Sequence, residues 1–205
     1  MPRITALVLF FLAFSSSLFA QETKSCEFCG TFYPADPTEL SGFIDQQLAK
    51  ADPAAIDGEI IAVQAPHAGY EYTGPVVAFA YKALVAKKFD TIVILGPTHH
   101  YAFSGISVYT GSYFQTPLGK LAVDPEIAAG LTDLPFAGTE ERYFQNEHSL
   151  EVEIPFIQKT MPGVKVAAIV FGDMNSAWME ALATRLAALA AKKHILVLAS
   201  SDLSH

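Results

Sequence analysis

Short apolar runs recur along this chain and end at glycine, proline or polar residues. They cover residues 59–65, 91–95, 105–110, 164–171 and 194–200. Aliphatic and β-branched runs with such ends are typical of strands that are buried on both faces of a sheet. The pattern therefore predicts a strand in each of these segments.

Helical repeats fill much of the sequence between the apolar runs. Asp36 and Ser176 stand at N-cap positions, and proline follows Asp36 and Asp124 as the first helical residue. Residues 114–119 predict a turn, which residues 120–123 follow as a short extended piece. The predicted helices run from Asp36 to residue 48, over residues 76–88, from Asp124 to about Leu131, and over residues 176–191.

Residues 147–155 fit two patterns. Leu150 begins an alternation of apolar and polar positions that is typical of a strand. Leu150, Ile154 and Ile157 also lie at the spacing of one helix face. We favour a helix with a kink at Pro155, because the apolar positions continue at helical spacing beyond the proline.

The alternation of strands and helices indicates an α/β fold with a mostly parallel sheet. The first two strands enclose one helix, so they should run parallel with a right-handed crossover. Ligands of such sheets bind beyond the carboxyl ends of the strands, which directs attention to the residues that follow each strand.

Three of the predicted strands end in histidine or aspartate. His67 follows the first strand, His99 and His100 follow the second, and Asp202 and His205 follow the last. Because the carboxyl ends of parallel strands share one edge of a sheet, these side chains should converge. Imidazole nitrogens bind iron, copper, zinc and nickel, so the pattern predicts a metal site at this edge.

Each of these residues also has a simpler interpretation. A loop histidine is often only hydrated, and His100 should point away from His99 because neighbouring residues of an extended chain face opposite ways. His194 opens a strand at the other edge of the sheet and is predicted to be structural. Glu147 is equally explained as a favourable charge at a helix N-terminus.

Composition limits the classes of function. The chain has 205 residues, 51% of them hydrophobic, and a formal net charge of −8. This length fits one domain, and the negative charge argues against nucleic acid as a partner. The motifs of serine hydrolases, P-loop enzymes, zincins and dinucleotide dehydrogenases are absent from the sequence.

Residues 1–20 have the pattern of a signal peptide. Arg3 supplies a positive charge, residues 6–14 form a short apolar core, and Ala20 ends a stretch of small residues that suits cleavage. We predict an exported protein, periplasmic or secreted, without stable membrane insertion after cleavage. An uncleaved anchor is the alternative, although a spanning helix needs about 20 apolar residues.

The only two cysteines, Cys26 and Cys29, form a C-x-x-C. In an exported chain we favour a disulfide between them. A metal-binding pair and a redox dithiol are the alternatives, although no second C-x-x-C completes a zinc site.

Six motifs occur in the order GTFYPADPTEL, APHAGYEYTGPVVAFAY, ILGPTHH, TPLG, NEHSLEVEIPF and SSDLSH. Together they resemble the Memo family, which in prokaryotes is also called AmmeMemoRadiSam system protein B. The resemblance covers residues 30–205 and implies a fold similar to that of LigB-type class III extradiol dioxygenases. That fold is a three-layer α/β sandwich with helices on both faces of a mostly parallel central sheet. The resemblance also implies a functional link to a radical SAM protein.

The resemblance implies a metal site with two histidines and one cysteine as ligands. The histidines correspond to His67 and His99, whereas the cysteine of the family lies beyond its SSD-x-x-H motif. We therefore expect the domain at residues 30–205 to be incomplete at its C-terminus. By the same resemblance, the catalytic part of the pocket contains Asp202, His205 and His148.

These features favour a dioxygenase-like oxidoreductase that acts on a small, phenolic ligand. His205 would act as acid or base with Asp202 orienting it, and the metal would be iron or copper, with zinc as a further candidate. One alternative is a module that binds a peptide or a small ligand without turnover, and another is a metal-dependent hydrolase. Three more residues would line the pocket: Tyr70, Tyr72 and His100.

Overall fold

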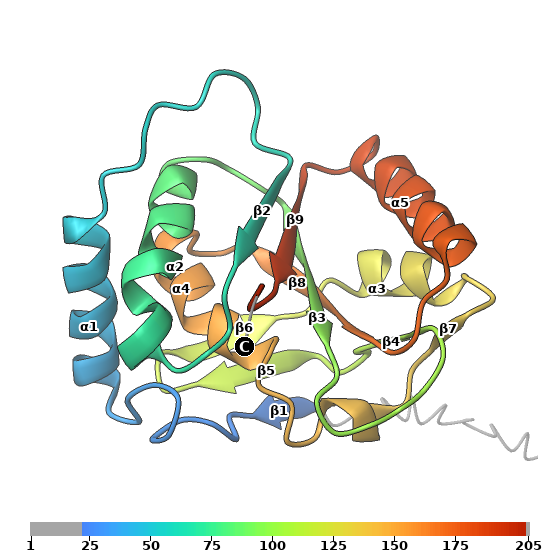
Figure 1. Cartoon of the computed structure of the whole chain (residues 1–205), viewed down its shortest axis with the longest axis horizontal. Coiled ribbons are helices and arrows are strands. Elements are labelled where there is room, and N and C mark those ends of the chain that lie inside the picture. Colours follow the sequence, from blue (N-terminus) through green and yellow to red (C-terminus); the bar gives the residue numbers. More distant parts are fainter. Residues whose placement is uncertain (1–21, 204–205) are drawn as a thin grey trace, which may run out of the picture.

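A six-stranded sheet forms the centre of the computed structural model, which describes residues 22–203 (Figure 1). Neighbouring strands run parallel, except that β4 is antiparallel to β8. The predicted signal peptide and His205 lie outside the described residues. In spatial order the strands are β2 (Ala62–Ala65), β9 (Ile195–Ser200), β3 (Thr91–Pro97), β8 (Lys165–Phe171), β4 (Ile106–Val108) and β7 (Ala137–Gly138).

The last strand of the chain lies between the first two strands of the predicted unit. The prediction that β2 and β3 run parallel is confirmed, but they are not neighbours because β9 pairs with both. Leu198 of β9 stands opposite Val63 on one side and Ile94 on the other. Strand β9 is apolar on both faces, and a central position buries both of them.

Helices cover both faces of this sheet (Figure 1). One face carries α1 (Pro37–Lys50), α2 (Tyr70–Leu84) and α4 (Ile154–Thr160), and the other carries α3 (Pro125–Thr132) and α5 (Ser176–Ala190). Alternate residues of β3 enter two separate cores, with Ile92 and Ile94 in the first and Val93 in the second. This arrangement confirms the predicted three-layer sandwich.

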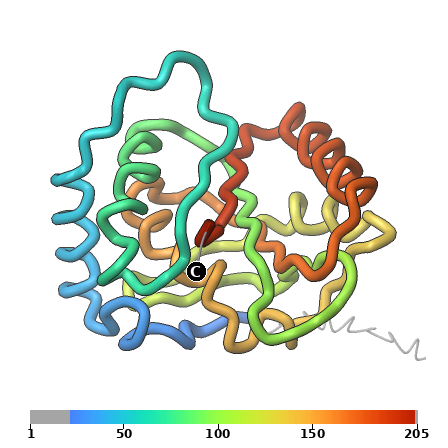
Figure 2. The backbone as a smooth tube through the Cα atoms, viewed as in Figure 1, coloured from blue at the N-terminus to red at the C-terminus, as the bar shows by residue number. Residues whose placement is uncertain are grey.

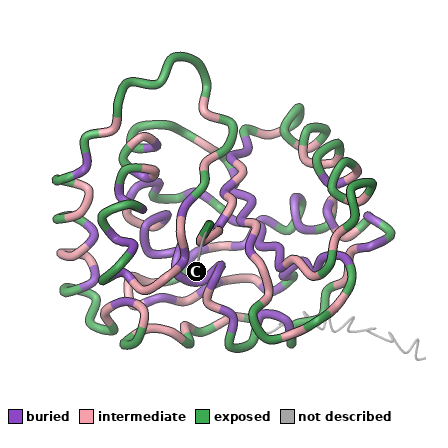
Figure 3. Tube along the Cα trace, in the orientation of Figure 1, coloured by how far each residue is buried: buried purple, intermediate pink, exposed green. Residues whose placement is uncertain are grey.

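The exposed parts of the molecule lie away from the sheet. The loop before β2 projects from the body of the protein (Figure 2), and most of its residues are exposed, whereas the central strands are largely buried (Figure 3). Strand β2 begins at Ala62 rather than at residue 59, because β9 pairs with it only from Val197 onward. Across residues 22–203, we find no helix with the length and apolar character that crossing a membrane requires.

The second helix begins earlier than its sequence predicts. We expected residues 76–88, but α2 runs from Tyr70 to Leu84 and contains Pro75. Its buried face includes Tyr70 and Tyr81, and this packing outweighs the hydrogen bond that the proline removes. The helix stops at Leu84 because Ala86 has a left-handed backbone with φ of 68°.

The ambiguous segment is helical from Glu151 onward, in line with the favoured helix, whereas residues 147–150 form a turn and Pro155 makes no kink. A 3-10 turn, η2 (Glu151–Glu153), leads directly into α4, which begins at Ile154. Pro155 therefore lies in the first turn of α4, where its missing N–H would have no helical partner in any case.

Of the two N-caps that the sequence predicts, at Asp36 and Ser176, the first is confirmed. Asp36 accepts hydrogen bonds from two N–H groups in the first turn of α1, and Asp124 does the same for α3. The predicted cap of α5 is wrong. Ser176 is already helical, and Asn175, with an extended backbone, accepts a hydrogen bond from the Trp178 N–H at 2.9 Å.

A second, three-stranded sheet of order β1-β5-β6 lies below the central one in Figure 1. Its strands are β1 (Thr23–Ser25), β5 (Tyr113–Thr116) and β6 (Gly119–Ala122). The turn predicted at residues 114–119 is therefore too long, because most of these residues pair in an antiparallel hairpin. Gly119 permits this tight connection, since its φ of 116° is unfavourable for other residues.

Candidate metal centre

Three histidines converge at the carboxyl edge of the central sheet. His67 follows β2, His99 follows β3, and His148 lies in the turn before η2. One ring nitrogen of each lies within 4.8 Å of a ring nitrogen of the other two. Strand-end reasoning brings His67 and His99 together, and the structure adds His148 as a nitrogen donor of the same cluster.

His67 is the buried member of the cluster, with only 1% of its surface exposed. Its backbone N–H donates a hydrogen bond to Asp202 Oδ1 at 2.6 Å, and its Nδ1 lies 3.1 Å from Ser200 Oγ. Its Nε2 is buried and has no hydrogen-bond partner. A buried polar atom without a partner costs about 1–3 kcal/mol, so this nitrogen fits a site that a ligand completes.

His99 is held by the carboxylate of Glu147. The Nδ1–H of His99 donates to Glu147 Oε1 at 2.9 Å, and its backbone N–H donates to Oε2 at 2.7 Å. This contact leaves Nε2 of His99 as the atom available to a metal, and a carboxylate behind a ligating histidine is a common arrangement. Glu147 therefore orients a candidate metal ligand, in addition to any role as a charge at a helix N-terminus.

Buried hydrogen bonds keep Glu147 ionised. Burial alone would raise its pKa, but the N–H of Ser149 and the ring and backbone of His99 all donate to it, and together they lower the pKa. An anion behind His99 strengthens that ring as a metal donor.

His148 is stacked on His99, with ring centroids 4.2 Å apart. Burial, followed by the neighbouring His99, lowers the pKa of His148 to about 4. Burial also lowers the pKa of His67. Both rings are therefore neutral at pH 7, and neutral imidazole is the form that binds metals.

The turn that carries His148 is anchored on the end of β3. Ser149 Oγ donates to the carbonyl oxygen of Pro97 at 2.9 Å. A side chain at Gly96 would meet Ser149 Oγ at 2.6 Å, so only glycine permits this close approach. The Gly-Pro that ends the strand in the sequence therefore also makes room for the third histidine.

The Cys26–Cys29 loop forms one wall of the cluster. The structure pairs these two cysteines in a disulfide. Within the loop, the N–H groups of Glu27 and Phe28 donate to the Glu151 carboxylate at 2.9 and 2.8 Å. The rings of two phenylalanines in and beside the loop, Phe28 and Phe32, lie with their centroids 5.4 and 4.7 Å from that of His148.

This contact leads to a prediction about the disulfide. The double variant Cys26→Ser, Cys29→Ser should loosen the wall and weaken divalent metal binding about 10-fold, the low end of effects seen when the support of a ligand is lost. Competition with a chromophoric chelator would measure the affinity. Phe32→Ala should shift it in the same direction, and unchanged affinity in both variants would mean that the loop does not hold His148.

The other predicted site residues lie in different surroundings. Tyr70 is buried in the core, where its hydroxyl donates to the Val152 carbonyl at 2.7 Å, whereas Tyr72 is 77% exposed. Asp202 contacts His67 as described, and His205 lies outside the described residues. His194 lies at the opposite edge of the sheet, where its Nε2 is 3.0 Å from Glu59.

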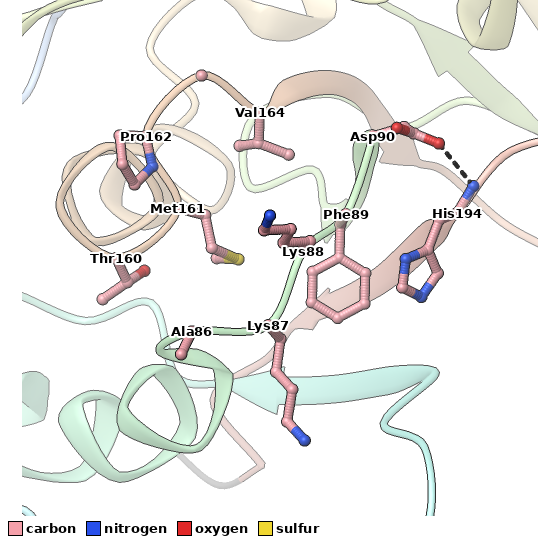
Figure 4. Close-up of a pocket in the computed structure, with 11 residues that line it drawn as sticks. Ala86, Lys87, Lys88, Phe89, Asp90, Thr160, Met161, Pro162, Val164 and His194 are labelled. Carbon is pink, nitrogen blue, oxygen red and sulfur yellow. Dashed lines mark hydrogen bonds between the residues drawn. The ribbon is translucent and has the colours of Figure 1, made fainter.

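Of the cavities that the described residues line, two bear on where a small ligand would fit. One of about 540 Å³ adjoins the cluster and is lined by His99, His100, Tyr101 and Phe103, among others. The other, of about 600 Å³, surrounds Phe89 and contains none of the three clustered histidines (Figure 4). Only the first cavity combines space for a ligand with a member of the histidine cluster.

The three histidines fit a divalent transition metal. They offer neutral nitrogen donors, one of which is buried without a partner, and imidazole suits iron, copper, zinc and nickel. Within residues 22–203 both cysteines are held in the disulfide, and the third donor that the cluster offers is a nitrogen of His148. Sequence reasoning placed His148 in the pocket but missed Ser200, whose position at the end of β9 was the available signal.

Comparisons with known proteins agree on one family. A family model described as "Memo-like protein" matches residues 24–205. The chain is 37% identical over 193 residues to a MEMO1 family protein of Sulfolobus acidocaldarius. This match covers 86% of this chain and 67% of that protein. A MEMO1 family protein of Pyrobaculum arsenaticum is 35% identical, with 86% and 66% covered. Protein memo-1 homolog of Caenorhabditis elegans is 31% identical, and the match spans 91% of this chain but 54% of the longer protein.

Proposed function

Because this chain belongs to the Memo-like family, we propose that it is a metal-binding protein with a redox role. His67, His99 and His148 would hold one divalent transition metal, and a small, phenolic ligand would occupy the adjoining cavity. The observation that carries the proposal is the buried Nε2 of His67, which has no partner and belongs to a cluster of three imidazoles.

The residues of the chain have separate tasks in this proposal. Glu147 orients His99, Asp202 holds the backbone of His67, and the disulfide loop supports His148. The aromatic side chains of Tyr101 and Phe103 would contact an aromatic ligand. When bound, iron or copper would supply electron transfer, and zinc would supply only Lewis acidity.

We also propose that the protein works outside the cytoplasm. The Cys26–Cys29 disulfide supports an oxidising compartment, where such bonds form and persist. This location is consistent with the signal-peptide pattern of residues 1–20. The functional link to a radical SAM protein, which the family resemblance implies, is a separate proposal about a partner protein.

Metal content tests the proposal. Protein purified without chelators or histidine tags should contain about one iron or copper per chain by mass spectrometry, the stoichiometry of one three-histidine site. His99→Ala should lose that metal because the ligating ring disappears together with its hydrogen bond to Glu147. His194→Ala is the matched control, since it removes a histidine at the far edge of the sheet and should keep the metal.

Each outcome separates the candidate functions. Iron or copper that depends on His99, together with oxygen uptake on addition of catechols, would support the redox role. Zinc that depends on His99, together with esterase or phosphatase activity, would replace it with hydrolysis. Absence of metal from aerobic and anaerobic preparations alike would contradict both and leave a ligand-binding module.

A further inference from the structure

A buried serine links His67 to the interior of the protein. Ser200 Oγ lies 3.1 Å from His67 Nδ1, 2.5 Å from the carbonyl oxygen of Ser149 and 2.9 Å from Glu153 Oε1. All three side chains, those of His67, Ser200 and Glu153, are almost completely buried, so water does not compete for these contacts.

The single hydrogen of the Ser200 hydroxyl decides the direction of these contacts. The Ser149 carbonyl can only accept, and at 2.5 Å the two oxygens would repel each other without a hydrogen between them. Ser200 therefore donates to Ser149, or shares its hydrogen with Glu153. Either acceptor directs the hydrogen away from His67, whether Glu153 is ionised or not.

The remaining contact fixes the tautomer of His67. Because the hydrogen of Ser200 is used elsewhere, its oxygen must accept from His67, and the proton of the neutral ring then resides on Nδ1. The lone pair of the ring resides on Nε2, the atom that has no partner. The opposite tautomer would put a hydrogen on Nε2 and exclude a metal there.

Glu153 contacts Ser200 on the side away from His67 and helps to fix its hydroxyl group. Its Oε2 accepts a hydrogen bond from the Tyr81 hydroxyl at 2.7 Å, which leaves Oε1 facing Ser200. In residues 22–203 no ion pair involves Glu153, so its carboxyl group is available to Ser200 rather than committed to a cation. The serine hydroxyl therefore lies between two acceptors, the Ser149 carbonyl and Glu153, and its hydrogen points away from His67.

We propose that Ser200 and Glu153 are positioning residues that keep the proton of His67 on Nδ1 and its Nε2 open toward His99 and His148. The role of this tautomer in metal binding rests on the proposed function. The tautomer itself is independent of that function, because it follows from hydrogen bonds in the protein without metal.

Nitrogen NMR of metal-free protein with ¹⁵N-labelled histidine tests the proposal. We expect wild-type His67, assigned through its loss in His67→Gln, to show a protonated Nδ1 and an unprotonated Nε2. Ser200→Ala should remove this preference, and Ser200→Thr, which keeps the hydroxyl, should restore it. Ser107→Ala is the matched control, since it removes another buried strand hydroxyl that donates to a carbonyl group.

Metal affinity provides the second measurement. Ser200→Ala should bind Zn²⁺ about 10–100-fold more weakly than wild type, and Glu153→Gln, whose amide still reaches Ser200, should lose less. A proton on Nε2 in wild type, or the same ¹⁵N pattern in Ser200→Ala, would overturn the proposal. If the tautomer is as expected but wild type binds no metal, the positioning stands and the proposed function fails.

Discussion

Replacing His148 by alanine is expected to weaken binding of Zn²⁺ or Cu²⁺ on the order of 100-fold. Structural zinc sites obtain about 10–16 kcal/mol from four ligands, or roughly 3 kcal/mol for each, and 1.4 kcal/mol is a factor of ten. The variant should lose the full binding free energy of one ligand, because the ring of His148 is held in place by stacking on His99 and its pKa of about 4 keeps it neutral.

Isothermal titration with a competing chelator would measure this change. His194→Ala should bind as wild type does, because it is remote from the cluster. Circular dichroism would verify that the His148 variant remains folded. Wild-type affinity in a folded His148→Ala protein would show that the third ligand comes from elsewhere.

Raising the pH from 4.5 to above 7 is expected to destabilise the wild type relative to Glu153→Gln by about 3 kcal/mol. Burial, opposed by the hydrogen bonds of Tyr81 and Ser200, raises the pKa of Glu153 from 4.5 to about 7. The folded state therefore binds this proton more tightly than the unfolded state. The resulting stabilisation is complete below pH 4.5, declines as the pH rises, and is lost above about pH 7.

Urea unfolding of both proteins between pH 4.5 and 8.5 would test this expectation. The difference between wild type and variant isolates Glu153, because the other titrating groups are shared. Glu180→Gln, at an exposed position of α5, is the control for the Glu-to-Gln change itself. A constant difference between wild type and Glu153→Gln across this range would mean that the folded protein does not hold the Glu153 proton.

Several elements were predictable because their causes are local. The caps at Asp36 and Asp124 depend on residues within one turn of each helix. The extent of α2 was not predictable, because Pro75 is locally unfavourable and only packing of the buried helix face outweighs it. The cap at Asn175 was missed because serine and asparagine are both good caps and stand side by side.

By itself, the sequence determined where the buried strands lie and that His67 and His99 follow two of them, because apolar runs and their Gly-Pro or polar ends are local signals. Only the tertiary structure decided that β9 separates β2 from β3 and brings Ser200 beneath His67. It also decided that the turn of His148 docks on Gly96. These contacts join residues far apart in the chain, and they depend on packing that no local pattern specifies.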